Sequence, residues 1–149
     1  MPAKNNKFVY DEYGNTAEIR VNARGVVVHG NNYVNKGTAF SETERGDLGL
    51  DGSLPPAVRP LAQQVKNSLK KVHKKEDDIE RYIYMRSLFD RNATLAHAVI
   101  ATDIPRFMEI IYTPTVGLAC QQYSSMFRTA NGVHIYPGNV HNAEEILRR

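Results

Sequence analysis

Apolar residues recur at every third or fourth position between Ala57 and about Lys75. They are Leu61, Val65, Leu69 and Val72. This spacing puts them on one face of an α-helix, so the segment predicts an amphipathic helix packed against a core. We interpret the lysines on its other faces as a solvated surface, because no aromatic residues alternate with them as they do in single-strand nucleic-acid sites. The lysines are Lys66, Lys70, Lys71, Lys74 and Lys75.

Three further segments continue the helical pattern. Residues 78–92 carry apolar side chains around most of a helix circumference, which predicts a helix buried in a core or in a subunit interface. Asp103 and Pro105 are residue types that begin a helix, and the apolar residues after them keep the helical spacing. Pro114 ends that helix, because the residue before a proline is disfavoured in helical conformation, and it starts another that runs to Phe127.

Two regions depart from this pattern. Residues 7–34 alternate runs of valine and isoleucine with turn residues, so they predict short strands joined by tight turns. Residues 133–136 predict one more short strand, after which Asn139 or Asn142 begins a last helix. Residues 41–44, with sequence SETE, match the capping box that starts a helix.

Length and composition fit one mainly α protein, because 149 residues suffice for a core of its own. We predict a small β-hairpin-like extension at residues 1–34 and a helical domain at residues 35–149.

The lone Cys120 excludes an internal disulfide and suits a reducing compartment, so we expect a cytoplasmic protein, with the mitochondrial matrix as the alternative. The net charge of +3 is far from the basic stripe of nucleic-acid binders, and no apolar run reaches the roughly 20 residues of a membrane span. Neither nucleic acid nor a membrane is therefore an expected partner.

Tyr112 lies at the predicted corner between one helix and the helix that Pro114 starts. We expect its hydroxyl near free N–H groups at the start of the second helix, where the helix dipole favours negative charge. Tyrosine ordinarily titrates near pH 10, so acid–base work at neutral pH requires a nearby cation, and no lysine follows Lys75. Two interpretations stay open, a packed tyrosine and a catalytic proton donor.

The sequence lacks the patterns of a complete metal or nucleotide site. Its five histidines have no metal-ligand spacing, and it contains neither a Gly-x-Gly-x-x-Gly run nor a Walker loop. We therefore expect no metal and no NAD or NADP to bind to this chain alone.

Several segments resemble the amino-terminal domain of malic enzymes, the oxidative decarboxylases of malate. They are NKGTAF at 35–40, the ER and LGLDGSLPP elements between 44 and 56, IERYIYMRSLFDRN at 79–92, IYTPTVGLACQQYSSMFR at 111–128 and NGVHIYP at 131–137. These segments follow the family's order, and YTPTVG is the most specific of them. Residues 1–33 lie outside the resemblance.

The resemblance implies that the chain is one part of an enzyme that converts malate to pyruvate and carbon dioxide. Tyr112 would be the general acid that protonates the enol of pyruvate. The family also needs Mg²⁺ or Mn²⁺, a lysine base and a domain that binds NAD or NADP, all of which it places after the point where this chain ends. The isolated chain is accordingly expected to be inactive. A homodimer or a higher homo-oligomer is expected, with the helix at 78–92 in the contact.

The resemblance also suggests an effector site. Malic enzymes that fumarate activates bind it between two arginines at the dimer interface, and Arg91 corresponds to one of them. Asn67 stands where the second would fall, and Arg59 where those enzymes have an acidic residue. Because asparagine brings no charge, we expect fumarate to bind weakly or not at all.

Two alternatives remain to this assignment. A malolactic enzyme resembles this region too, but it releases lactate from malate and keeps its NAD bound. A non-catalytic helical module for oligomerisation or regulation would have retained the fold without the chemistry. Assaying the full-length protein for lactate without net NADH formation separates the first alternative, and the sequence that follows Arg149 separates the second.

Overall fold

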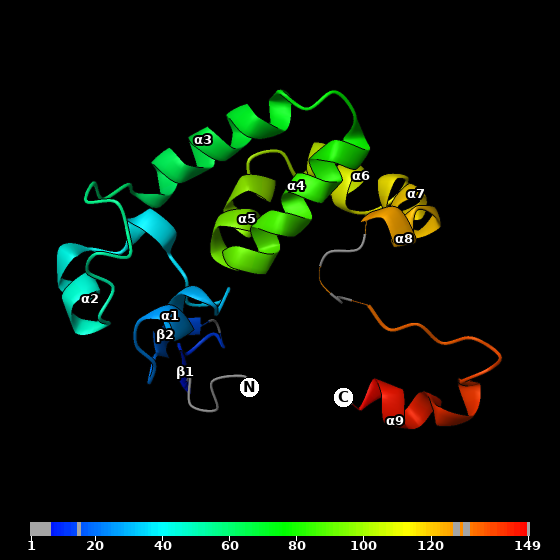
Figure 1. Cartoon of the computed structure of the whole chain (residues 1–149), viewed down its shortest axis with the longest axis horizontal. Coiled ribbons are helices and arrows are strands. Elements are labelled where there is room, and N and C mark those ends of the chain that lie inside the picture. The colour runs from blue at the N-terminus through cyan, green and yellow to red at the C-terminus, as the bar shows by residue number, and fades with distance from the viewer. Residues whose placement is uncertain (1–6, 15, 127–128, 130–131, 149) are drawn as a thin grey trace.

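The computed structural model describes residues 7–14, 16–126, 129 and 132–148, and it is mostly helical, as predicted. Helix α3 (Leu61–His73) spans one side of the molecule, α4 (Asp78–Arg91) and α5 (Ala93–Ile100) lie beneath it, and α6 (Ile104–Ile111) leads into α7 (Thr115–Gln121) (Figure 1). None of the helices within the described residues is both long and apolar enough to span a membrane.

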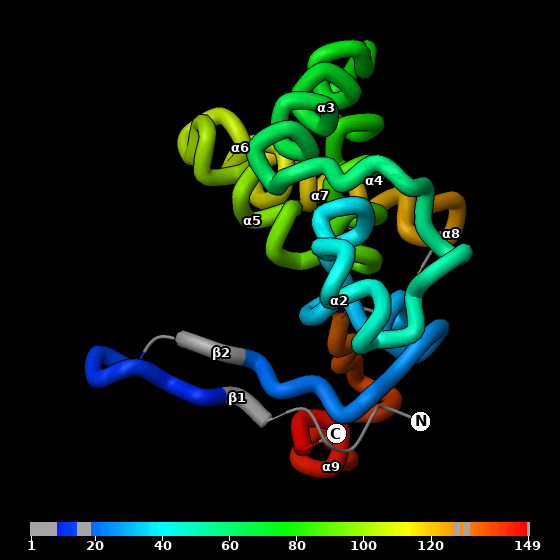
Figure 2. Tube along the Cα trace, turned by 90° about the vertical axis from the view of Figure 1, so that its left-hand side faces the viewer, coloured from blue at the N-terminus to red at the C-terminus, as the bar shows by residue number. Residues whose placement is uncertain are grey.

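The first described residues form the expected β-hairpin. Strand β1 (Lys7–Tyr10) pairs antiparallel with β2 (Thr16–Arg20), and the register aligns Phe8 with Ile19. The hairpin projects sideways from the helical body (Figure 2). The division of the chain into residues 1–34 and residues 35–149 stays a prediction.

The sequence predicted a strand at the three consecutive valines, Val26 to Val28, and this prediction is wrong. Val26–His29 form a short helix, α1, that follows Gly25. Gly25 adopts a positive φ of 59°, and its N–H donates to the Leu48 carbonyl at 2.8 Å. The resulting turn directs Val28 into a core with Phe40 and Leu50, where its side chain is fully buried. Burial of Val28 therefore outweighs the strand preference of valine.

Arg45 holds the loop that surrounds this second core. It lies in α2 (Glu42–Asp47), whose start has the predicted capping box at Ser41. The guanidinium is buried and donates to four main-chain carbonyls, with no carboxylate among these acceptors. The acceptors are those of Phe40 at 3.0 Å, Pro55 at 2.7 Å, Pro56 at 3.3 Å and Thr38 at 3.4 Å. Arg45 thus fixes the loop before α2 to the proline-rich loop after it.

Helices α3 to α6 enclose the main core. Its buried residues come from all four helices, which confirms the amphipathic patterns read from the sequence. They are Val72, Met85, Leu88, Leu95, Ala96, Val99, Phe107 and Ile110. Asp77 caps α4 and Asp103 caps α6, each accepting from the backbone N–H three residues on. Partly buried side chains on α4, Tyr82 and Tyr84 among them, pack around this core.

Two asparagines link the second core to the turn between α4 and α5. The Asn32 amide donates to the Phe89 carbonyl at 2.9 Å, and the Asn32 carbonyl accepts from the Ala93 N–H at 3.0 Å. The Asn35 amide donates to the Arg91 carbonyl at 2.9 Å and to the His29 carbonyl at 3.1 Å. We call these contacts the asparagine clamp.

The last part of the chain differs from the prediction in two places. The helix expected to run to Phe127 ends at Gln121 and is followed by a short helix α8 (Tyr123–Met126), while Phe127 lies outside the described residues. Residues 133–136 form no strand. Their polar backbone is engaged locally instead, because Asn139 accepts from the Tyr136 N–H and donates to the His134 carbonyl.

A 3₁₀ turn (Val140–Asn142) and helix α9 (Ala143–Leu147) follow, beginning at the two asparagines named as possible helix starts. Neither asparagine side chain makes a capping hydrogen bond. Figure 1 shows α9 apart from the main helices.

Candidate functional site

Tyr112 occupies the predicted corner between two helices. Its N–H donates to the Met108 carbonyl at 2.9 Å, which closes the last turn of α6. Its carbonyl accepts from the Val116 N–H at 2.7 Å, which fastens the first turn of α7. The backbone of Tyr112 is therefore held by both helices.

Thr115 fixes the same corner from inside. It is 2% exposed, and its hydroxyl donates to the Glu109 carbonyl at 2.6 Å. This bond satisfies a carbonyl near the end of α6 that the helix itself leaves without a partner. The angle between α6 and α7 is consequently set by a buried contact directly beside Tyr112.

An ion pair fixes α6 against α4. Arg106 donates to both carboxylate oxygens of Asp78, at 2.5 Å and 3.1 Å, and Arg81 donates to one of them at 2.7 Å. The hydrogen bonds from Arg106 and then Arg81 hold the pKa of Asp78 below its usual value, against the opposing effect of burial. The same contacts, together with Glu109, raise the pKa of Arg106. The helix that ends at Tyr112 is thus anchored through charge as well as through its apolar face.

The Tyr112 side chain projects from this rigid corner into an open position. It is 60% exposed, and its hydroxyl makes no hydrogen bond to any described residue. The expected approach of the hydroxyl to N–H groups of α7 is thus not seen. The corner presents a phenol that is accessible to a molecule or a protein surface from outside this chain.

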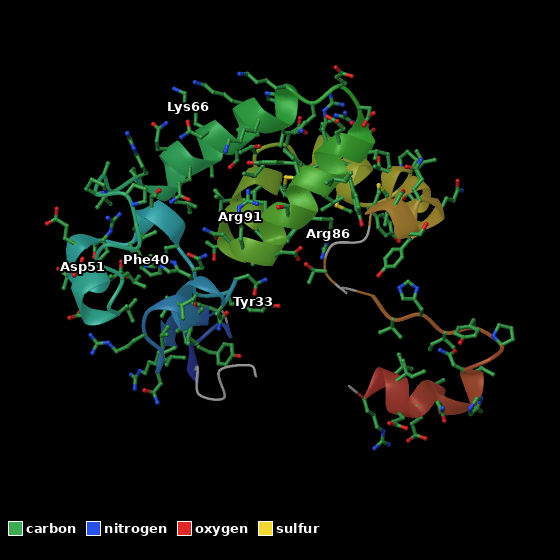
Figure 3. The ribbon with its side chains drawn as sticks, viewed as in Figure 1. Tyr33, Phe40, Asp51, Lys66, Arg86 and Arg91 are labelled. Carbon is green, nitrogen blue, oxygen red and sulfur yellow. The ribbon has the colours of Figure 1, made fainter. Side chains whose placement is uncertain are left out.

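The cavity nearest this corner is separate from the Tyr112 phenol. A cavity of about 430 Å³ lies beside α4 and α7, and its polar lining includes Arg86, Asp90 and His134. The guanidinium of Arg86 (Figure 3) lies 3.6 Å from a carboxylate oxygen of Asp90. The same guanidinium lies over the ring of Phe89. Tyr112 does not line this cavity.

Metal-binding groups do not gather near Tyr112. Across residues 7–14, 16–126, 129 and 132–148, no three His, Cys, Asp or Glu side chains lie close enough to hold a metal ion. Glu144 is engaged by Arg148 at 2.5 Å. The divalent metal that the resemblance implies for the complete enzyme therefore stays a prediction.

The two positions named for an effector lie on different helices. Arg91 donates to the carbonyl and the hydroxyl of Ser87, at 2.9 Å and 2.8 Å, and lies 5.8 Å from the centre of the Tyr84 ring. Asn67 accepts from Gln63 at 3.1 Å within α3. Lys66 lies on the outer side of α3, away from Arg91 (Figure 3). No hydrogen bond or ion pair among the described residues joins Arg91 to α3.

Comparisons with a family model and with single known proteins point to the same family. Residues 89–149, which include Tyr112 and Arg91, match the family described as "Malic enzyme, N-terminal domain". Over 112 residues, 75% of this chain and 20% of the relative, the chain is 46% identical to the NADP-dependent malic enzyme of Anas platyrhynchos. The resemblance to malic enzymes is confirmed.

Malic enzymes of both cofactor types are among these relatives. The NADP-dependent malic enzyme of Homo sapiens is 43% identical over 112 residues, which are 75% of this chain and 20% of that protein. The NAD-dependent malic enzyme of Aliivibrio fischeri (strain MJ11) is 38% identical over 114 residues, 76% of this chain and 20% of that protein. The chain thus spans about a fifth of the length of the malic enzymes that it matches.

Proposed function

We propose that the chain is the amino-terminal part of a malic enzyme that converts malate to pyruvate and carbon dioxide, and that Tyr112 is its general acid. The malic enzyme matches support the reaction class. The observation that carries the role of Tyr112 is the fixed corner, where α6, α7 and buried Thr115 hold the backbone while the phenol stays 60% exposed.

Such a phenol suits the last step of this reaction. Once carbon dioxide has left, the enol of pyruvate gives its O–H proton to a base, which the resemblance implies is a lysine beyond this chain, and takes a proton on the carbon that carried the carboxylate. The Tyr112 hydroxyl supplies that proton, and the carbon becomes the methyl group of pyruvate. Because both helices hold the backbone of Tyr112, only its side-chain torsions are left to be ordered when the phenol meets the substrate. NAD or NADP and the divalent metal bind to the complete enzyme outside the described residues.

Tyr112→Phe in the complete enzyme tests this role. The variant keeps the ring and loses the proton, so we expect pyruvate formation from malate to fall by about 10²- to 10⁴-fold. Reduction of oxaloacetate to malate should fall much less, because it reverses the oxidation step and involves no protonation of the enol. Tyr136→Phe is the matched control, since Tyr136 is also 60% exposed. Turnover of Tyr112→Phe close to that of the wild type would show that Tyr112 is structural.

We further propose that Arg91 belongs to an interface and does not form a fumarate site. Its guanidinium is engaged by Ser87 and Tyr84 of its own helix, and Asn67 offers no second positive charge. A fumarate titration of the complete enzyme at subsaturating malate should show no activation. Several-fold activation that disappears in Arg91→Ala would contradict this proposal.

A further inference from the structure

The outward face of α6 is unusually apolar for a surface helix. It consists of Ile104, Pro105, Met108, Glu109 and Tyr112, all of them exposed. Ile104 is 57% exposed, Met108 42% and Tyr112 60%. Because these three residues are spaced four apart, they form one stripe along the helix, which we call the α6 stripe. Glu109, the only charged residue of this face, is held by Arg106 at 2.9 Å.

The opposite face of α6 is apolar as well and is already buried in the main core. Phe107 is 2% exposed and Ile110 is 1% exposed, both within the main core. A helix that is apolar on both sides is typical of a position between two packed bodies. The described residues supply only one of these bodies. The Asp78–Arg106 contact also holds α6 in place, so the stripe stays on the surface.

The position of Tyr112 indicates what covers the α6 stripe. Tyr112 is the last residue of the stripe, and a proton donor must lie beside the bound substrate. Among the described residues, no three His, Cys, Asp or Glu side chains lie close enough to hold the metal that the reaction requires. The matching malic enzymes are about five times longer than the aligned segment, so most of each lies outside it.

We infer that the α6 stripe is the docking surface for the part of the enzyme that binds the metal and the dinucleotide, with Ile104 and Met108 setting the position of Tyr112 against the substrate. This inference rests on the proposed function. Ile104 and Met108 are positioning residues, and the partner surface is apolar and belongs to the same polypeptide. Docking buries the stripe and brings the phenol to the active site in one step.

Oxidation of Met108 tests the docking without any activity assay. Oxidation of methionine by hydrogen peroxide follows exposure, so Met108 should oxidise readily in the isolated chain and roughly tenfold or more slowly in the complete enzyme. Peptide mass spectrometry gives both rates. Met85, which is 0% exposed, is the internal control and should react slowly in both proteins. Equal rates for Met108 in the two proteins would overturn the inference. Protection of Met108 in the isolated chain that increases with its concentration would also overturn it, since a second copy would then cover the stripe.

A substitution provides the second measurement. Met108→Asp should leave the melting temperature of the isolated chain unchanged within about 2 °C, because the site is exposed there. In the complete enzyme it should lower that temperature by several degrees and raise KM for malate. If Met108→Asp has no effect in the complete enzyme while Tyr112→Phe still abolishes pyruvate formation, the docking surface is wrong and the proposed function stands. If neither variant has an effect, both fail.

Discussion

Arg45 shows at the scale of one residue how a charge can be buried with no ion pair to any described residue. Its donors reach four neutral carbonyls from two separate loops, so the desolvated guanidinium is compensated by hydrogen bonds alone. Nothing local in the sequence indicates this role, because the acceptors lie in two loops on either side of α2, up to 11 residues away.

Arg45→Met should therefore be strongly destabilising. It removes the donors and leaves the carbonyls of Phe40, Pro55 and Pro56 without this partner, which costs about 1–3 kcal/mol in the free energy of unfolding. Arg45→Lys should recover only part of this loss, because a single ammonium cannot reach all four acceptors. Urea unfolding measures both variants. Arg59→Met is the control at an exposed position and should change little. Equal stabilities for Arg45→Met and Arg59→Met would contradict the assigned role.

At the scale of elements, the helices with clear start signals were predictable. Ser41 and Asp103 cap helices as the sequence predicted, and the periodic apolar residues indicated which face is buried. The predictions failed where contacts distant in the sequence decide the outcome. Val26–His29 are helical because Val28 fills a core formed by residues further along the chain. Residues 133–136 have the composition of a strand but pair with neither β1 nor β2, and a ladder needs a partner strand.

The corner at Tyr112 was predictable from the sequence, because a proline interrupts an apolar helical repeat there. The Asp78–Arg106 contact that anchors the corner joins residues 28 apart and has no such signal. The asparagine clamp is similarly hidden, because its bonds to the α4–α5 turn join residues 56 or more apart.

The stability that the Asp78–Arg106 ion pair contributes by joining α4 to α6 should depend on pH. The folded pKa of Asp78 lies below that of the unfolded chain, which is near 3.9. Its contribution to stability is thus fully present above about pH 4 and is lost as the pH falls through the folded pKa. Asp78→Asn should cost about 0.5–1 kcal/mol at pH 7, since these side chains are partly exposed. Thermal unfolding from pH 7 to pH 2 should show the difference between variant and wild type shrinking below about pH 4.

Glu144→Gln is the control for this experiment. Glu144 pairs with Arg148 in an exposed helix turn, so its loss should leave stability unchanged at either pH. A constant difference between Asp78→Asn and the wild type across the whole range would exclude the carboxylate as the cause.

At the scale of the whole molecule, polar contacts join two apolar cores. The main core belongs to α3 to α6, and the second core surrounds Phe40. The asparagine clamp runs from the second core to the α4–α5 turn of the first. Cooperative unfolding of the two cores therefore depends on a few hydrogen bonds.

Asn32→Ala combined with Asn35→Ala should weaken this cooperativity. The double variant leaves the Phe89 and Arg91 carbonyls without their partners, at a cost of about 1–3 kcal/mol. Hydrogen exchange should then show residues 26–54 opening at a lower free energy than α4 and α5. Asn31→Ala is the control, because its amide oxygen accepts only from the nearby Tyr33 N–H. Uniform exchange across both cores in the double variant would show that apolar contact alone couples them.

The hairpin has a practical consequence as a place for a probe. Its tip at residues 11–14 is exposed, and Gly14, at a φ of 80°, has open space around its Cα. An exposed loop tip of this kind accepts inserted sequence readily. A short peptide epitope or a fluorophore introduced beside Tyr13 would therefore report on the tumbling and assembly of the protein while leaving α6 and its corner untouched.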